Sequence, residues 1–229
     1  MPPTDIVGQD YSFGLNEGYS GQIRVKSVSL QPQGYYPTTM TTSNSIDFIA
    51  AVGLAGTGKS TFVNYLATQT QWPTVYFGGQ VLQEVKARGL EQTPDNERLV
   101  REDLRRIHGS AAMAKLALTD VDLDASRAWP LIIDGLYSDA ELTFLRERLA
   151  DRLLVVAIHA SFETRARRLA NRPSRPLTAV EIRQRDRAEV EHINKAPPIA
   201  LADKHFVNDG DLTALQCFAD DIVFAMSRN

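Results

Sequence analysis

From residue 46 onward, short apolar runs alternate with amphipathic stretches. The apolar runs are rich in branched and aromatic residues, which is typical of strands that are buried on both faces of a parallel sheet. We expect five strands, at residues 46–52, 74–77, 131–134, 153–159 and 205–207. Alternation of strand and helix predicts an α/β fold with one parallel sheet and crossover helices.

The stretches between these strands have helical spacing and helix-start signals. Helices are expected at residues 61–67, 80–88, 96–108, 111–119, 140–152 and 161–171. A further helix is expected after Thr178, because Glu181 follows it at the spacing of a capping box.

Residues 1–44 differ from the rest of the chain, because they contain four tyrosines and several glycines and have little helix-favouring sequence. Residues 22–30 alternate in part between apolar and polar, which indicates a strand that would add to a sheet edge or contact a partner. A mostly disordered tail is the equal alternative, since a lone strand does not stabilise itself. We therefore divide the chain into an N-terminal extension, residues 1–44, with a possible protein-partner or oligomer contact, and one domain, residues 45–229.

The first strand runs directly into a glycine-rich segment, GLAGTGKST, at residues 53–61. Its glycines permit a tight turn whose N–H groups face inward, its lysine adds a mobile positive charge, and its serine hydroxyl reaches a magnesium ion. A glycine-rich turn with an exposed lysine is the structural alternative. The segment predicts a triphosphate site formed by Gly53, Gly56, Thr57, Gly58, Lys59, Ser60 and Thr61.

The third expected strand ends in Asp134, followed by Gly135. An acid at this place next to a phosphate loop can hold magnesium, as the carboxylate of a Walker B strand does. The alternative is an ordinary turn-forming aspartate. Ser60 and Asp134 are therefore the expected metal residues, and Lys59 and Asp134 are expected to be catalytic.

A proline-rich break at residues 172–176 carries Arg172 and Arg175, which we expect to close over the reacting phosphoryl group as a mobile flap. Arg183, Arg185 and Arg187 follow on the next helix, where a solvated charged face is as good an interpretation as function. Earlier in the chain, Arg98, Arg101 and Arg105 recur at helical spacing, and one face could present them to an anionic acceptor. Interleaved acids also fit a salt-bridged, exposed helix there.

Composition narrows the function classes. The chain has 229 residues and a formal net charge of -3, with no large basic block, so a nucleic-acid groove is not indicated and a small polyanionic ligand fits better. Cys217 is the single cysteine, which excludes an internal disulfide; we expect it to be a buried thiol in a protein of the reducing cytoplasm. No apolar stretch has the length of a membrane span, and the start of the chain does not read as a signal peptide.

The glycine-rich segment at residues 53–61 is a Walker A motif. It is followed along the chain by Gly78-Gly79-Gln80-Val81, Ile133-Asp134-Gly135, Arg185-Asp186-Arg187 and Val207-Asn208-Asp209-Gly210. With these segments in this order, residues 46–225 resemble the P-loop nucleotide kinases. The resemblance is strongest to the adenylate kinase-like and archaeal dephospho-CoA kinase-like members. It implies a three-layer P-loop NTPase sandwich whose five-stranded sheet has the order 2-3-1-4-5, with an acceptor-binding insertion and a lid. It also implies ATP and Mg²⁺ as cofactors, Arg172 as a lid arginine, and Asn208, Asp209 and Gly210 beside the adenine.

The sequence departs from that family in the acceptor half. Gly79-Gln80 and then Gln83 stand where the family usually has Gly-Asp and an arginine, and Leu136, Tyr137 and Ser138 replace another arginine. We expect Gln80, Gln83, Arg101 and Tyr137 near the acceptor, although an ordinary nucleoside monophosphate is in doubt.

These observations predict an ATP- and Mg-dependent phosphotransferase that acts on a nucleotide or a nucleotide-like small molecule. The first alternative is a P-loop ATPase that signals its nucleotide state to a partner. The second is a polynucleotide or modified-base kinase, which the negative net charge disfavours.

Overall fold

The computed structural model describes residues 46–125, 127 and 129–226. The expectations for the extension, residues 1–44, and for a strand at residues 22–30 lie outside the described residues. None of the described helices combines the length and the apolar character that a membrane span requires.

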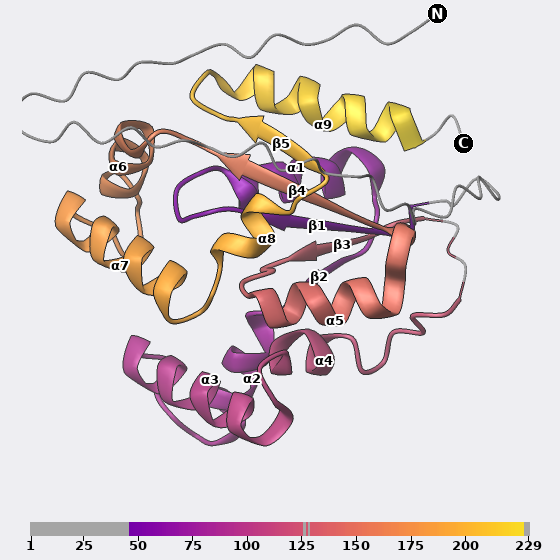
Figure 1. Cartoon of the computed structure of the whole chain (residues 1–229). Coiled ribbons are helices and arrows are strands. Elements are labelled where there is room, and N and C mark those ends of the chain that lie inside the picture. The colour runs from indigo at the N-terminus through magenta and orange to yellow at the C-terminus, as the bar shows by residue number, and fades with distance from the viewer. Residues whose placement is uncertain (1–45, 126, 128, 227–229) are drawn as a thin grey trace, which may run out of the picture. The chain divides into compact units, whose positions relative to one another are not determined.

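A five-stranded parallel sheet forms the centre of the fold (Figure 1). Its strand order is β2-β3-β1-β4-β5, which confirms the order expected from the resemblance. The strands are β1 (Phe48–Val52), β2 (Thr74–Tyr76), β3 (Leu131–Asp134), β4 (Leu153–His159) and β5 (Lys204–Val207). All five residues of β1 are buried, as expected for the central strand of a sheet that is covered on both faces.

The described helices connect these strands. They are α1 (Lys59–Thr70), α2 (Gly79–Ala87), α3 (Pro94–His108), α4 (Ala112–Ala117), α5 (Asp139–Leu149), the 3-10 turn η1 (Ala150–Arg152), α6 (Phe162–Ala170), α7 (Ala179–Glu191), α8 (Ala196–Ala200) and α9 (Leu212–Met226). The expected capping box of Thr178 and Glu181 is present at the start of α7.

Alternate residues of the strands point to opposite faces of the sheet and define two apolar cores. Phe48, Ala50 and Val52 of β1 pack on one face with apolar residues of α2, α3, α4 and α5. Ile49 and Ala51 pack on the other face, against α1 and α9. The result is the three-layer sandwich that was expected, with helices on both faces of the sheet.

A third, smaller cluster lies behind the glycine-rich segment. Ala55 of that segment packs on Leu169 of α6 and Ile182 of α7, all three buried. The loop is therefore anchored to the helices that follow β4, at the carboxyl edge of the sheet.

The helices expected at residues 96–108 and 111–119 are α3 and α4, which are separated at Gly109, where α3 ends with a φ of 85°. One expectation at the level of a single residue is corrected, because Cys217 is exposed and not buried. The buried face of α9 is defined by Leu215, Ala219 and Ile222, at spacings of four and three, and Cys217 lies off that face.

Candidate active site

The segment between β1 and α1 is folded tightly against its neighbours. Gly53 and Gly58 have φ values of 147° and 102°, a region that favours glycine. A Cβ on Gly53 would collide with the backbone carbonyl oxygen of Ile158, and one on Gly58 would collide with the side-chain amide of Asn208. The neighbours of the loop thus leave no room for larger residues at these two positions.

The amino end of α1 differs from those of α3, α5, α6 and α7. Those four helices are capped by the side chains of Thr93, Ser138, Ser161 and Thr178. The α1 helix starts after Gly58, has no side-chain cap, and has no acidic residue in its first turn. An uncapped helix start presents N–H groups and the positive end of the helix dipole, which together suit a phosphate.

Lys59 lies in this first turn, and its Nζ donates a hydrogen bond to the carbonyl oxygen of Leu54, at 2.8 Å. Burial, and then the positive charge of Lys195, lower its pKa to about 7. An ammonium group in these surroundings is short of negative charge. A phosphate group in the loop would supply it.

Asp134 ends β3 and is paired in register with Ala51 of β1 and Tyr76 of β2. Burial raises the pKa of its carboxyl, although Lys59 and the Gly135 N–H oppose the shift. The half-buried carboxylate of Asp134 and the hydroxyl of Ser60 line the same cavity and form an oxygen donor pair of the kind that Mg²⁺ prefers. These two residues fit a magnesium ion that also binds the phosphates.

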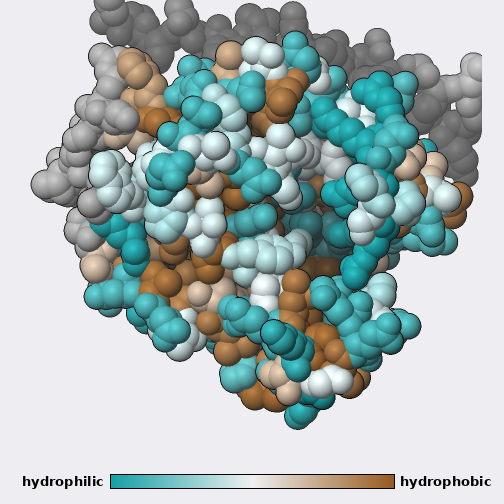
Figure 2. All heavy atoms as spheres, turned by 180° about the vertical axis from the view of Figure 1, so that it is seen from behind, coloured by the Kyte–Doolittle hydropathy of each residue, from teal (hydrophilic) through white to brown (hydrophobic). Residues whose placement is uncertain are grey.

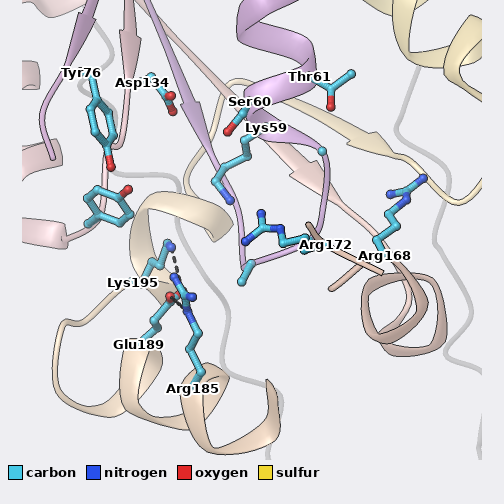
Figure 3. Close-up of a pocket in the computed structure, with 14 residues that line it drawn as sticks. Lys59, Ser60, Thr61, Tyr76, Asp134, Arg168, Arg172, Arg185, Glu189 and Lys195 are labelled. Atoms are coloured by element: carbon cyan, nitrogen blue, oxygen red, sulfur yellow. Dashed lines mark hydrogen bonds and ion pairs between the residues drawn. The ribbon is translucent and has the colours of Figure 1, made fainter. Parts of the chain in front are cut away.

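The loop and Asp134 line a cavity of about 580 Å³, which we call the donor cavity (Figure 3). Five cationic side chains line it, together with the two carboxylates of Asp134 and Glu189, so cations are in excess. The cations are Lys59, Arg168, Arg172, Arg185 and Lys195. This charge balance suits a polyanion.

A cluster of three charged residues forms one wall of the donor cavity. Glu189 accepts hydrogen bonds from Lys195, at 2.7 Å, and from Arg185, at 2.9 Å. Burial alone would raise the pKa of Glu189, but its two cationic partners outweigh that effect and leave the pKa below its ordinary value. From the sequence, Arg185 is as good a surface residue as a functional one, and Glu189 is a candidate to orient the arginines of its helix. Lys195 and Arg168 were missed, because no spacing or motif marks them.

A second cavity, of about 480 Å³, lies against the first, and we call it the acceptor cavity. Tyr76, Tyr137, Arg185 and Glu189 line both cavities. Its other lining residues include the arginines Arg98, Arg101, Arg105 and Arg175 and the apolar Val81, Leu82, Met113 and Ile193. Figure 2 shows the molecule hollowed on the face opposite to that of Figure 1, with mostly hydrophilic residues around the hollow.

The two arginines of the expected flap lie in different places. Arg172 lines the donor cavity, whereas Arg175 lines the acceptor cavity and pairs with Glu97 of α3 at 3.1 Å. The segment between α6 and α7 thus borders both cavities.

Several predicted residues support the donor cavity without lining it. Asn208 is buried and donates from Nδ2 to the carbonyl oxygen of Thr57, at 2.8 Å, and Asp209 accepts a hydrogen bond from the Ser161 N–H, also at 2.8 Å. Thr57 donates from its hydroxyl to the carbonyl oxygen of Leu54. Gly53 and Gly210 are likewise absent from the residues that line the cavity, whereas Gly56, Gly58, Ser60 and Thr61 line it.

Of the four residues expected near the acceptor, Arg101 and Tyr137 line the acceptor cavity. Gln80 and Gln83 instead line a shallower depression with Leu104, Ile107 and His108 of α3. The helix α2 is rotated so that its face with Val81 and Leu82 lines the acceptor cavity. The two glutamines lie on another face of the helix and therefore do not line this cavity.

A glycine loop between a central strand and a helix, with an acid at the end of the neighbouring strand, defines a P-loop NTPase of the kinase-like topology. The sequence model of the AAA domain family matches residues 49–191. The chain belongs to this family.

The chain is also similar in sequence to curated relatives and in fold to solved structures. The chain is 33% identical over 173 residues to a UPF0200 protein of Hyperthermus butylicus, covering 75% of this chain and 90% of that protein. It is 35% identical over 164 residues to a UPF0200 protein of Methanopyrus kandleri, covering 70% of this chain and 80% of that one. TT1252 of Thermus thermophilus has a similar fold, with a TM-score of 0.53 at 19% identity, covering 78% of this chain and 96% of that chain. A shikimate kinase of Bacteroides thetaiotaomicron gives 0.50 at 15% identity, covering 78% and 97%.

Proposed function

We propose that the protein is an ATP- and Mg-dependent phosphotransferase, which moves the γ-phosphoryl group of ATP to a nucleotide or a nucleotide-like small molecule. The observation that carries the proposal is the pair of cavities with a common wall at the carboxyl edge of the sheet. A protein that only hydrolyses ATP needs the donor cavity alone. A second cavity beside it offers room for an acceptor.

The lining of the acceptor cavity supports the class of acceptor. Arg98, Arg101 and Arg105 come from α3, and apolar and aromatic residues form other parts of the lining. Arginine side chains bind phosphate and carboxylate groups well, while apolar and aromatic surfaces suit a planar or apolar body. A nucleotide-like molecule combines both parts.

The positions of the side chains in the donor cavity support a role for each of them. Lys59 and the N–H groups at the start of α1 would bind the β- and γ-phosphates, and Ser60 and Asp134 would hold the magnesium ion. Bound magnesium supplies positive charge to the phosphate oxygens. Arg172 would add charge from the flap, and such fixed charges stabilise the transition state more than they do the bound substrate.

The test is incubation with ATP labelled in its γ-phosphate and a panel of nucleotides and metabolites, followed by separation of the products. We expect a labelled product with at least one compound. Lys59→Ala should lower kcat/KM by roughly 100-fold or more, since several kcal/mol of electrostatic stabilisation are lost. Lys204→Ala, at an exposed position on β5, is the matched control and should leave transfer unchanged.

The alternatives predict different results. A nucleotide-switched ATPase would release phosphate slowly and label no compound in the panel. A polynucleotide kinase would label DNA or RNA and bind it in a salt-sensitive manner. Label transfer that persists in folded Lys59→Ala protein would contradict the proposed mechanism.

A further inference from the structure

Lys195 lies where the donor and acceptor cavities meet. It lines the donor cavity. Its ion-pair partner Glu189, and Arg185, which pairs with the same carboxylate, line both cavities. Its Nζ lies 4.8 Å from the ring centre of Tyr137, another residue that lines both cavities. Figure 3 shows Lys59, Arg172 and Lys195 directed toward one common space.

The position of Lys195 is unfavourable for a charged side chain. Its exposed fraction is 1%, and burial of an ammonium group is unfavourable unless its charge is balanced. Glu189, with an exposed fraction of 6%, is its only ion-pair partner among the described residues, and it also pairs with Arg185. One carboxylate therefore pairs with two cations. The buried Glu141 also attracts Lys195, more weakly than Glu189 does, but its carboxylate accepts hydrogen bonds from the N–H groups of Tyr137 and Ser138. The ion-paired groups at the wall thus carry one more positive than negative charge.

A purely structural role does not require this excess. The main chain already joins the two segments, because the Lys195 N–H donates to the Glu189 carbonyl oxygen at 3.1 Å. In addition, the positive charge of Lys195 disfavours the ammonium form of Lys59. An anion placed between the two lysines would relieve both effects.

We propose that Lys195 is a second phosphate-binding lysine, which contacts the γ-phosphoryl group as it passes from the donor cavity to the acceptor cavity. This inference rests on the function proposed above. Glu189 and Arg185 position the ammonium group. One Nζ hydrogen is used by Glu189 and the ring face of Tyr137 lies beside it, so donor capacity remains for phosphoryl oxygens.

Lys195 keeps its protons throughout the proposed transfer of the phosphoryl group. The bond between the γ-phosphorus and its bridging oxygen breaks, and the electron pair stays on the β-phosphate. A lone pair of an acceptor oxygen forms the new bond to phosphorus, and any proton on that oxygen leaves to water. Lys195 stays an ammonium group and offsets the charge on the equatorial oxygens.

The test uses MgADP with aluminium fluoride, a planar mimic of the phosphoryl group in transfer, so that it does not depend on knowing the acceptor. The dissociation constant of MgADP is measured with and without aluminium fluoride, for the full chain. In the wild type, aluminium fluoride should tighten MgADP binding by about 100-fold or more, as transition-state analogues do. Lys195→Met should lose at least about tenfold of that gain, while MgADP alone binds within about threefold of the wild type.

Two further variants complete the design. Lys204→Met, on the exposed edge of the sheet, should behave as the wild type does. If Lys195→Met does not fold, the double variant Lys195→Met with Glu189→Gln takes its place, because it leaves no buried carboxylate short of a partner.

The outcomes separate this inference from the function on which it rests. A folded variant at position 195 that keeps the whole gain from aluminium fluoride would overturn the role of Lys195, as would a wild type without any gain. A wild type that does not bind MgADP at all would instead refute the proposed function.

Discussion

Lys59 and Asp134 are perturbed in opposite directions, and burial is the largest cause for both. The pKa of Lys59 falls to about 7, and that of Asp134 rises. Each shift disfavours the charged form of the residue, and each would be reversed by a ligand of opposite charge. A triphosphate next to Lys59 and a magnesium ion next to Asp134 would supply these two charges.

The lysine gives a prediction for the pH dependence of binding. Without a ligand, Lys59 has a pKa of about 7 and loses its proton as the pH rises through this value. A bound triphosphate favours the ammonium form and therefore raises the pKa of Lys59. Binding above pH 7 therefore takes up a proton, and affinity should fall with rising pH, by at most about tenfold per pH unit. Titration of a non-hydrolysable ATP analogue with magnesium from pH 6.5 to 9 measures this effect.

Lys59→Met is the control for this titration, since methionine fills the position without titrating. Its weaker binding should vary less with pH than that of the wild type. Equal pH profiles in the two proteins would show that Lys59 does not titrate on binding.

Elements with a strong local signal could be predicted from the sequence. The strands are short apolar runs, and the loop at residues 53–61 carries its chemistry in consecutive residues, so both could be read locally. Lys195 could not be predicted in this way, because it reaches the wall of the donor cavity only when α7 and α8 fold back toward it. A sequence pattern predicts that a segment is helical, but it does not predict how the helix is rotated against its neighbours. For this reason the positions of Gln80, Gln83 and Cys217 were predicted wrongly.

The α3 helix offers a matched pair of arginines for a test of the acceptor cavity. Arg101 lines this cavity and has no ion-pair partner among the described residues, while Arg106 is exposed and pairs with Asp103 at 2.8 Å. Arg101→Gln should raise KM for the acceptor about tenfold or more, because a charge-assisted hydrogen bond is lost. Arg106→Gln should leave KM unchanged.

Steady-state kinetics with the acceptor found in the product screen measures this difference. ATP affinity should be the same in both variants, because neither arginine lines the donor cavity. An equal effect of the two substitutions on KM would place the acceptor elsewhere.

At the scale of the whole domain, the strand order explains where the site lies. After β1 the chain passes toward β2 on one side, and after β4 it passes to β5 on the other, so the switch point of the sheet lies between β1 and β4. Ligands of open α/β sheets bind at the carboxyl ends of the strands at such a point. The glycine loop follows β1 there, and segments from before β3 and after β4 complete the two cavities.

The central claim is that this edge of the sheet binds a magnesium-triphosphate. The most direct measurement is calorimetry of a non-hydrolysable ATP analogue with the folded protein, with and without magnesium. We expect binding at one site that strengthens with magnesium and weakens by about tenfold or more in Lys59→Met. A well-folded wild-type protein without magnesium-dependent affinity for any purine triphosphate would contradict it.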